Sequence, residues 1–345
     1  MAPDRTGTLR RSLLTWDVAV VVVLAVVIAV ASGSVDSFAS QRNWGFLLLD
    51  LVPIALIALP MTLVVITGEI DLSVASTLGL VSAAAGKMWA DTTLPLTLIV
   101  VLCVLLGALL GAVNGVFVTR FGLPSLAVTI GTLALYRGLA FVVLGDRAVA
   151  DFPTGWTDGA VGFLPGTRIP WVVLPLLALV LVFALVLHAT PVGRALYAMG
   201  NSTDAATFAG IDVARTKMWL YVVIGAVSGV AGVFWTFRYA SARADNGNGL
   251  ELQVVAGVLL GGVSIFGGRG GLLGVVAGVL LLGTLRNALQ LDNVSADALT
   301  VVTGGLLIVS VLLPNAAAWL RSTTAQRSRR AGANPVTPAS SANPA

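Results

Sequence analysis

The chain has 345 residues, of which 57% are hydrophobic and only 10% are charged, with a formal net charge of +4. A soluble domain of this size would lack the polar side chains to cover its surface, so the composition excludes a mainly water-soluble protein. The basic residues occur singly or near the termini without interleaved aromatic residues, which argues against nucleic-acid binding. The composition therefore predicts an integral protein of the lipid bilayer.

Ten apolar segments are predicted to cross the membrane as helices, because about 20 apolar residues span a hydrocarbon core about 30 Å thick. In chain order they are residues 18–35, 45–67, 70–86, 94–119, 124–144, 170–189, 218–239, 252–267, 271–289 and 298–319. The third and eighth are the shortest, and each is a candidate for a tilted, broken or re-entrant helix. The predicted fold class is all-α, a polytopic transmembrane helix bundle of about ten spans.

The first apolar segment has a second interpretation. Three arginines precede the apolar run Val18 to Ala31, which ends in Ala29-Val30-Ala31 and imitates a signal peptide with its cleavage site. We expect an uncleaved first span, because the rest of the chain is itself embedded and needs a cytoplasmic start.

The distribution of basic residues predicts the orientation. Ten spans with a cytoplasmic N-terminus place twelve basic residues inside, which are Arg5, Arg10, Arg11, Arg120, Arg194, Arg215, Lys217, Arg269, Arg321, Arg327, Arg329 and Arg330. Six lie outside, which are Arg42, Lys87, Arg147, Arg168, Arg238 and Arg243. This excess obeys the positive-inside rule, so both termini are expected to be cytoplasmic.

The predicted organisation has three parts. Residues 1–17 form a cytoplasmic N-terminus, residues 18–320 form the transmembrane domain, and residues 321–345 have the composition of a disordered cytoplasmic tail. Two connections are too long to be turns: an outer one over 145–169 and an inner one over 190–217.

Glycines recur at every fourth position in three predicted spans, and such ridges allow helices to approach closely. They predict a tightly packed bundle, with a role as moving surfaces as the alternative. The positions are Gly107, Gly111 and Gly115, then Gly225 and Gly229, then Gly270, Gly274 and Gly278.

Reactive side chains are scarce. The chain has one cysteine, Cys103, and one histidine, His188, so it can form neither an intrachain disulfide nor a zinc ligand set. The glycine-rich run 267–271 lacks the pattern of a phosphate-binding loop and is expected to be a tight cytoplasmic turn. We expect no metal, no cofactor and no catalytic residue, so any nucleotide hydrolysis must occur on another chain.

A few polar side chains lie at predicted membrane depth. Because an unpaired charge is costly there, each of these side chains is a candidate for a functional role. Arg137 and Arg286 can alternatively extend toward the outer membrane interface, because each lies near the end of its predicted helix. With Asp50 isolated from any second buried acid, ion-coupled secondary transport is the weaker alternative. The side chains are Asp50, Asn114, Thr129, Arg137, Arg286 and Asn287.

The inner connection contains the pattern of a short capped helix. Asn201 or Ser202 can cap it, Asp204 lies in its first turn, and Gly210 can end it. A compact helix with an apolar anchor such as Phe208 has the form of a docking element, although a simple connecting helix fits the same pattern.

This connection resembles that of the permease subunits of ATP-binding-cassette importers for ribose, xylose, galactose, rhamnose and autoinducer sugars. Asp204-Ala205-Ala206 followed by Gly210-Ile211 is similar to the family's coupling motif E-A-A-x-x-x-G-I, and residues 193–194 and 198–201 match the segment before it. The resemblance implies that the ATP-binding subunit contacts Arg194, Gly200, Asp204, Ala205, Ala206, Phe208, Gly210 and Ile211.

Two further segments resemble the same family. Residues 66–76 are similar to I-T-G-G-I-D-L-S-V-G-S and depart from it at Glu69 and Ala75, and residues 122–133 are similar to G-L-P-P-F-I-A-T-L-G-T-L. Asp71 also has a simpler interpretation as a cap for the next span. Candidates for the translocation path are Asp71, Ser73, Asn114, Thr129, Arg137 and Asn287.

The resemblance implies a bacterial cell-membrane protein that hydrolyses nothing itself. Its expected partners are ATP-binding subunits, a second permease copy or paralogue, a soluble sugar-binding protein and the sugar. Because the binding protein largely sets specificity in such systems, no clamp of aromatic and carboxylate side chains is expected in the spans.

Overall fold

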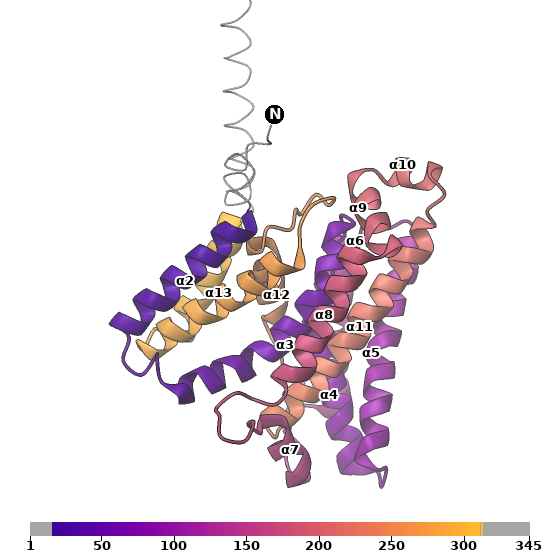
Figure 1. The fold of residues 1–345 in the computed structure, drawn as a ribbon. Helices are drawn as coiled ribbons and strands as arrows, with labels where there is room; N and C mark the ends of the chain where they lie inside the picture. The colour runs from indigo at the N-terminus through magenta and orange to yellow at the C-terminus, as the bar shows by residue number, and fades with distance from the viewer. Residues whose placement is uncertain (1–15, 311, 313–345) are drawn as a thin grey trace, which may run out of the picture.

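The computed structural model describes residues 16–310 and residue 312, and this part of the chain is folded into helices joined by short connections (Figure 1). Within these residues no β-strand occurs, and the extended contacts are two isolated bridges, Val149 with Ala242 and Phe163 with Pro170. The all-α prediction is thus confirmed for the described chain. Most of the predicted N-terminal segment, the end of the tenth predicted span and the C-terminal tail lie outside these residues.

Twelve labelled helices follow one another along the described chain. They are α2 (Trp16–Ser34), α3 (Gln41–Ile66), α4 (Val74–Asp91), α5 (Leu96–Thr119), α6 (Ser125–Leu144), α7 (Thr154–Val161), α8 (Val173–Ala189), α9 (Pro191–Asn201), α10 (Thr203–Phe208), α11 (Val213–Arg238), α12 (Leu250–Leu260) and α13 (Leu272–Leu291). A further apolar helix covers Ala296–Ser310.

Six of these helices are long and apolar enough to cross a membrane: α2, α3, α5, α6, α11 and α13. The helices α8 and α9 pass the same test together but are bent by 67° at their junction, which raises the number to seven if they form one span. The described residues therefore establish six or seven candidate spans, and the predicted number of about ten is not confirmed.

The two shortest predicted spans differ from the others. Residues 67–73 are irregular before α4 begins at Val74, and α12 ends at Leu260, where Gly261 and Gly262 follow. An 11-residue helix such as α12 is about 16 Å long, roughly half the hydrocarbon thickness, so it does not cross a bilayer by itself. The left-handed backbone of Gly262, with φ of +86°, ends the helix.

Helices α3 and α4 form the centre of the bundle. Eighteen of the 26 residues of α3 are buried, including the whole stretch from Leu56 to Ile66, and α4 is buried from Val74 to Ala83. Apolar side chains at consecutive positions suit a helix that is surrounded by others. In Figure 1 the other helices of the bundle lie on either side of this pair, and α2 lies against α13 at the edge.

Helices α5 and α11 cross at their glycines. A Cβ atom on Gly111 would lie within 3.0 Å of the Tyr221 carbonyl oxygen, and one on Gly225 would meet the Gly107 carbonyl oxygen at a similarly short distance. Backbone thus packs directly on backbone, which is the arrangement that the glycine spacing predicts.

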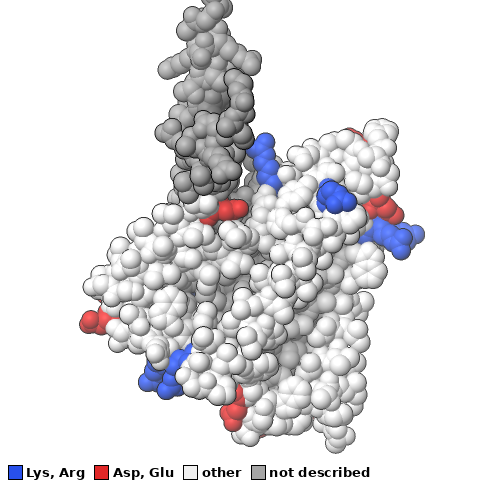
Figure 2. Space-filling model, viewed as in Figure 1, with Lys and Arg blue, Asp and Glu red and all other residues white. Residues whose placement is uncertain are grey.

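The two ends of the molecule are distinct. One end carries α9 and α10, and the opposite end carries α7 and the connection between α6 and α8 (Figure 1). Figure 2 shows charged side chains toward these ends and an uncharged band between them on the visible face. An uncharged surface band between two charged ends is the pattern expected of a protein in a bilayer.

Candidate functional site

The connection between α8 and α11 forms two short helices with well-defined starts. Thr190 caps α9 by accepting a hydrogen bond from the Gly193 amide at 3.4 Å, and Ser202 caps α10 by accepting one from the Ala205 amide at 3.2 Å. After α10 the chain turns at Gly210, whose φ is +85°. The sequence prediction of a short helix capped at Ser202 and ended at Gly210 is confirmed.

Helix α9 rests directly on two other segments. A Cβ atom on Gly200 would lie within 3.0 Å of the Ile66 carbonyl oxygen and the Gly268 amide nitrogen, and the Gly268 amide itself donates to the Ile66 carbonyl at 2.8 Å. The Tyr197 hydroxyl donates to the Gly270 carbonyl at 2.7 Å. Three segments therefore meet at one junction, where backbone packs closely on backbone: the end of α3, the end of α9 and the turn 264–271.

Helix α10 projects away from this junction (Figure 1). Phe208 is 93% exposed, whereas Ala206 is 2% exposed and packs inward. The remaining predicted coupling residues, Arg194, Asp204, Ala205, Gly210 and Ile211, are exposed or partly exposed on the same connection. Phe208 thus presents an apolar ring at the end of a short helix that projects from the bundle.

Three predicted path residues belong to one buried hydrogen-bond network. The Asp71 carboxylate accepts hydrogen bonds from the Ser73 amide at 2.9 Å and the Ser73 hydroxyl at 2.6 Å, and the Asn114 side chain donates to the Ser73 hydroxyl at 2.8 Å. All three side chains are at most 1% exposed. The network shapes the irregular segment before α4. The N-cap residue of α4 is Ser73, which forms no side-chain cap bond, so the interpretation of Asp71 as the cap of this helix is wrong, and its carboxylate instead stabilises the turn before it.

Thr129 supports the same segment from α6. Its hydroxyl lies 3.2 Å from the Ile70 carbonyl oxygen, and the Ser125 hydroxyl accepts from the Ile70 amide at 3.3 Å. Nearby, Glu69 forms an ion pair with Lys217 of α11, and both side chains are about four-fifths or more buried. Segment 67–73 is thus attached to α5, α6 and α11 at the end of the molecule that carries α9.

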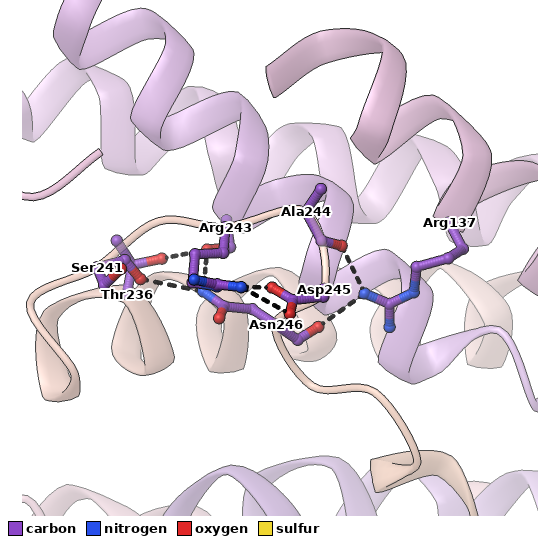
Figure 3. Close-up of polar contacts among 8 residues, drawn as sticks. Arg137, Thr236, Ser241, Arg243, Ala244, Asp245 and Asn246 are labelled. Atoms are coloured by element: carbon purple, nitrogen blue, oxygen red, sulfur yellow. Dashed lines mark hydrogen bonds and ion pairs between the residues drawn. The ribbon is translucent and has the colours of Figure 1, made fainter. Parts of the chain in front are cut away.

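Arg137 holds the connection between α11 and α12. Its guanidinium donates to the carbonyl oxygens of Ala244 at 2.7 Å, Asn246 at 2.9 Å and Ala75 at 3.3 Å. Figure 3 shows the Arg137 side chain reaching from α6 toward this connection. The Arg137 guanidinium is therefore used to bind backbone carbonyl oxygens of the protein.

The connection itself is further braced. Arg243 and Asp245 form a two-bonded ion pair with distances of 2.8 and 3.0 Å (Figure 3), and this pairing with Arg243 lowers the pKa of the Asp245 carboxyl. The Asn246 side chain donates to the Ser82 hydroxyl at 2.9 Å. A loop with this many contacts has few alternative conformations.

Asn287 lies on the wall of a polar cavity. It exchanges hydrogen bonds of 2.8 and 3.1 Å with Asn43, which joins α13 to the start of α3. Asp50 and Arg286, the other polar residues at predicted depth, line the same cavity together with Trp235 and Tyr239. The cavity brings aromatic and carboxylate side chains together from distant parts of the chain, which no sequence motif indicated.

The described residues contain no group of three or more histidine, cysteine, aspartate or glutamate side chains that could hold a metal ion. Cys103 is buried between α5 and α4, with its sulfur 3.8 Å from the Val81 carbonyl oxygen. The polar features of the molecule are therefore hydrogen-bonding groups and ion pairs.

A family profile described as the branched-chain amino acid transport system, permease component, matches residues 43–311. The chain belongs to this family. The match covers most of the chain and includes both the α9–α10 connection and the helices around the polar cavity. The protein is therefore a multi-pass membrane protein and the permease component of an ATP-binding-cassette transport system, in which ATP hydrolysis is carried by separate subunits.

Curated relatives cover nearly the same residues. The ribose import permease protein RbsC of Bacillus subtilis (strain 168) is 37% identical over 293 residues, which are 84% of this chain and 89% of the relative. The autoinducer 2 import system permease protein LsrD of Escherichia coli (strain K12) is 33% identical over 304 residues, 86% of this chain and 91% of the relative. The autoinducer 2 import system permease protein LsrD of Yersinia enterocolitica is 33% identical over 274 residues, which are 76% of this chain and 80% of the relative. No solved structure matches the chain.

Proposed function

We propose that the protein forms the translocation pathway for a monosaccharide or a related sugar in a bacterial cell-membrane importer. The similarity to import permeases for ribose and autoinducer 2 supports this substrate class. Its partners are two ATP-binding subunits, a second permease, either a copy or a paralogue, and a soluble binding protein that delivers the sugar. Ion-coupled transport remains the weaker alternative, because Asp50, the carboxylate at predicted membrane depth, is paired with Arg238.

The proposed topology follows the distribution of charge. Residues 1–17 and 321–345 are cytoplasmic, residues 18–320 form the membrane domain, and the connection 190–217 faces the cytoplasm while 145–169 faces outward. We propose that ten segments enter the membrane, with α12 as a half-length helix sheltered by its neighbours. Short or irregular segments are tolerated at membrane depth when protein surrounds them.

The α9–α10 connection is proposed as the element that couples the ATP-binding subunit to the pore. The observation that carries this proposal is the exposed Phe208 at the end of α10, which offers an apolar anchor for a groove on a partner. Directly behind it, α9 contacts the end of α3 and the turn before α13. A partner that moves α10 therefore acts on two helices of the bundle, which supplies the differential contacts that coupling requires.

The test uses Phe208→Ala, which removes the anchor without altering the core, and Ala205→Glu, which adds a charge to an exposed position. Phe121→Ala is the matched control, since Phe121 is also an exposed phenylalanine, 65% accessible, but lies outside the α9–α10 connection. The permease is reconstituted in vesicles with its ATP-binding subunits and binding protein, and assembly is checked by size-exclusion chromatography.

We expect both α10 variants to fold normally and to lose sugar uptake and binding-protein-stimulated ATP hydrolysis, and the control to retain both. Wild-type uptake, hydrolysis and assembly in Phe208→Ala and Ala205→Glu would contradict the coupling role. Uptake that persists without any ATP-binding subunit and depends on an ion gradient would favour the secondary carrier.

A further inference from the structure

A cavity of about 260 Å³ lies between α3, α11, α12 and α13. Two other cavities of the bundle, one between α3, α8 and α13 and one between α3, α8 and α11, are lined by apolar side chains such as Leu51, Leu176 and Val180. The wall of this cavity instead carries seven side chains with different hydrogen-bonding or aromatic groups: Asp50, Trp235, Tyr239, Gln253, Arg286, Asn287 and Gln290. Its chemistry therefore differs from that of a packing defect between helices.

These groups match a small molecule with many hydroxyls. The amides of Gln253, Asn287 and Gln290 each offer both a donor and an acceptor, as a hydroxyl group does. The rings of Trp235 and Tyr239, whose centroids are 5.0 Å apart and whose planes are inclined at 48°, supply aromatic surface beside them. Leu47 and Ile54 complete the wall with apolar contacts. A wall that combines apolar surface with a few polar groups is typical of a small-molecule site.

Of the two charged side chains in the cavity wall, Asp50 has a cationic partner and Arg286 has a neutral hydroxyl as its partner. The Asp50 carboxylate accepts from the Arg238 guanidinium at 3.0 Å and from the Tyr239 hydroxyl at 3.3 Å, and the Arg286 guanidinium donates to the Thr303 hydroxyl at 2.6 Å. A zwitterionic amino acid would need a carboxylate and a guanidinium that are free to bind it. Because Asp50 already has a cationic partner, the arrangement favours a neutral ligand.

The walls of the cavity are held in place from outside it. Tyr239 and Leu250 stand at the two ends of the α11–α12 connection, which Arg137 binds through two carbonyl oxygens. On the other side, the Asn43–Asn287 pair joins α3 to α13. Tyr239 follows the last residue of α11, at the end of that helix away from α10, so the cavity lies toward the proposed outer side of the membrane.

We propose that this cavity is a binding site for a neutral polyhydroxylated ligand of monosaccharide size, on the outer part of the translocation route. The cavity is slightly smaller than the roughly 300–1,000 Å³ of sites for drug-sized ligands, which agrees with a small solute. The inference rests on the proposed function and adds to it the residues that receive the sugar. It also gives a role to Arg137 as a positioning residue for the cavity wall.

The first experiment measures protection from chemical modification. Gln290→Cys places a thiol at an exposed position of the cavity wall, and Gln41→Cys places one at an exposed position of α3 outside the wall, as the matched control. The native Cys103 is buried and adds little background. The full-length permease in its complex is treated with a small water-soluble methanethiosulfonate, with D-ribose, D-xylose, D-galactose, L-rhamnose or L-leucine present in excess.

We expect at least one of the sugars to slow modification of Gln290→Cys severalfold and to leave Gln41→Cys unchanged, and we expect L-leucine to have no effect. Protection by L-leucine alone would overturn the proposal in favour of a zwitterion site. The absence of protection by any of the four sugars would also overturn it.

The second experiment separates this inference from the proposed function. Gln253→Leu removes a polar group from the wall at similar size, and Gln41→Leu makes the same change at the exposed control position. In reconstituted vesicles we expect Gln253→Leu to assemble normally with its partners and to reduce sugar uptake severalfold, and Gln41→Leu to behave as wild type. Sugar uptake by Gln253→Leu equal to that of the wild type would overturn the cavity assignment alone. A wild-type complex that takes up none of the sugars would overturn the proposed function.

Discussion

The close crossing of α5 and α11 can be tested with a matched pair of glycine substitutions. Gly111 faces the backbone of Tyr221 and Gly225, so a methyl group there meets carbonyl and Cα atoms that no side-chain rotation can move away. Gly131 lies inside α6 with nothing within 4 Å of the position of a Cβ atom. Both glycines are in helix interiors, so each change to alanine gains the same helix propensity of about 1 kcal/mol.

The two variants therefore differ only by the cost of overpacking, which is about 1–3 kcal/mol for an added methyl group in a tightly packed site. We expect Gly131→Ala to stabilise the permease and Gly111→Ala to be net neutral or destabilised by up to about 2 kcal/mol. Gly111→Leu adds three further carbons and is expected to prevent folding. The assay is the thermal unfolding midpoint in one detergent, followed by size-exclusion chromatography.

The measured quantity is the difference between the midpoints of Gly111→Ala and Gly131→Ala. Equal midpoints would refute the backbone-to-backbone crossing, because the propensity contribution is common to both variants. A Gly111→Leu protein that expresses and transports normally would refute it as well.

Three other features give further predictions. Single cysteines at Thr203 and Thr154 test the topology in intact cells: an impermeant reagent should label only Thr154→Cys, and the reverse labelling pattern would show that the orientation is inverted. Arg137→Gln removes charge-assisted hydrogen bonds to carbonyl oxygens, each worth about 1.5–3 kcal/mol. We therefore expect a lower thermal unfolding midpoint and faster amide hydrogen exchange in the α11–α12 connection. Unchanged exchange in this connection would contradict the proposal that Arg137 holds it in place. Glu69→Gln breaks a mostly buried ion pair and should lower the free energy of unfolding by about 1–3 kcal/mol. The double variant Glu69→Gln, Lys217→Met should lower it less, because no unpaired charge remains. If the effects of the two single changes simply add in the double variant, the two residues act independently.

Helix positions could be predicted from the sequence because apolar runs of membrane length leave little choice of structure. The start of α10 was also predictable, since a capping serine and a terminating glycine act locally. The span at 70–86 was harder to place, because the Asp71–Ser73 turn replaces the first helical turn and the apolar pattern does not show it. The length of the eighth span was overestimated because glycine is frequent inside membrane helices, so Gly261 and Gly262 did not mark the end of α12 at Leu260.

The surroundings of the functional residues could not be predicted from the sequence. Asp71 and Ser73 belong to a recognisable motif and Asn114 is a polar residue at predicted membrane depth, but the sequence gives no information on whether these residues face a channel or one another. The polar cavity was missed because Trp235, Tyr239 and Gln253 lie far along the chain from Asp50, and no periodicity connects them. The difference between Ala205 and Ala206 was also hidden, since a two-turn helix has too few residues to define a buried face.

Helix α3 connects the polar cavity to the segment that lies under α9. It passes Asp50 at the wall of the cavity and ends at Ile66, whose carbonyl oxygen lies under α9, and Pro53 and Pro60 lie between these two points. Each proline removes a backbone hydrogen bond, which leaves the carbonyl oxygens of Leu49 and Leu56 without their usual partners in the helix. Pro53 and Pro60 are therefore the two points at which α3 bends most easily, and both lie between the cavity and the contact with α9.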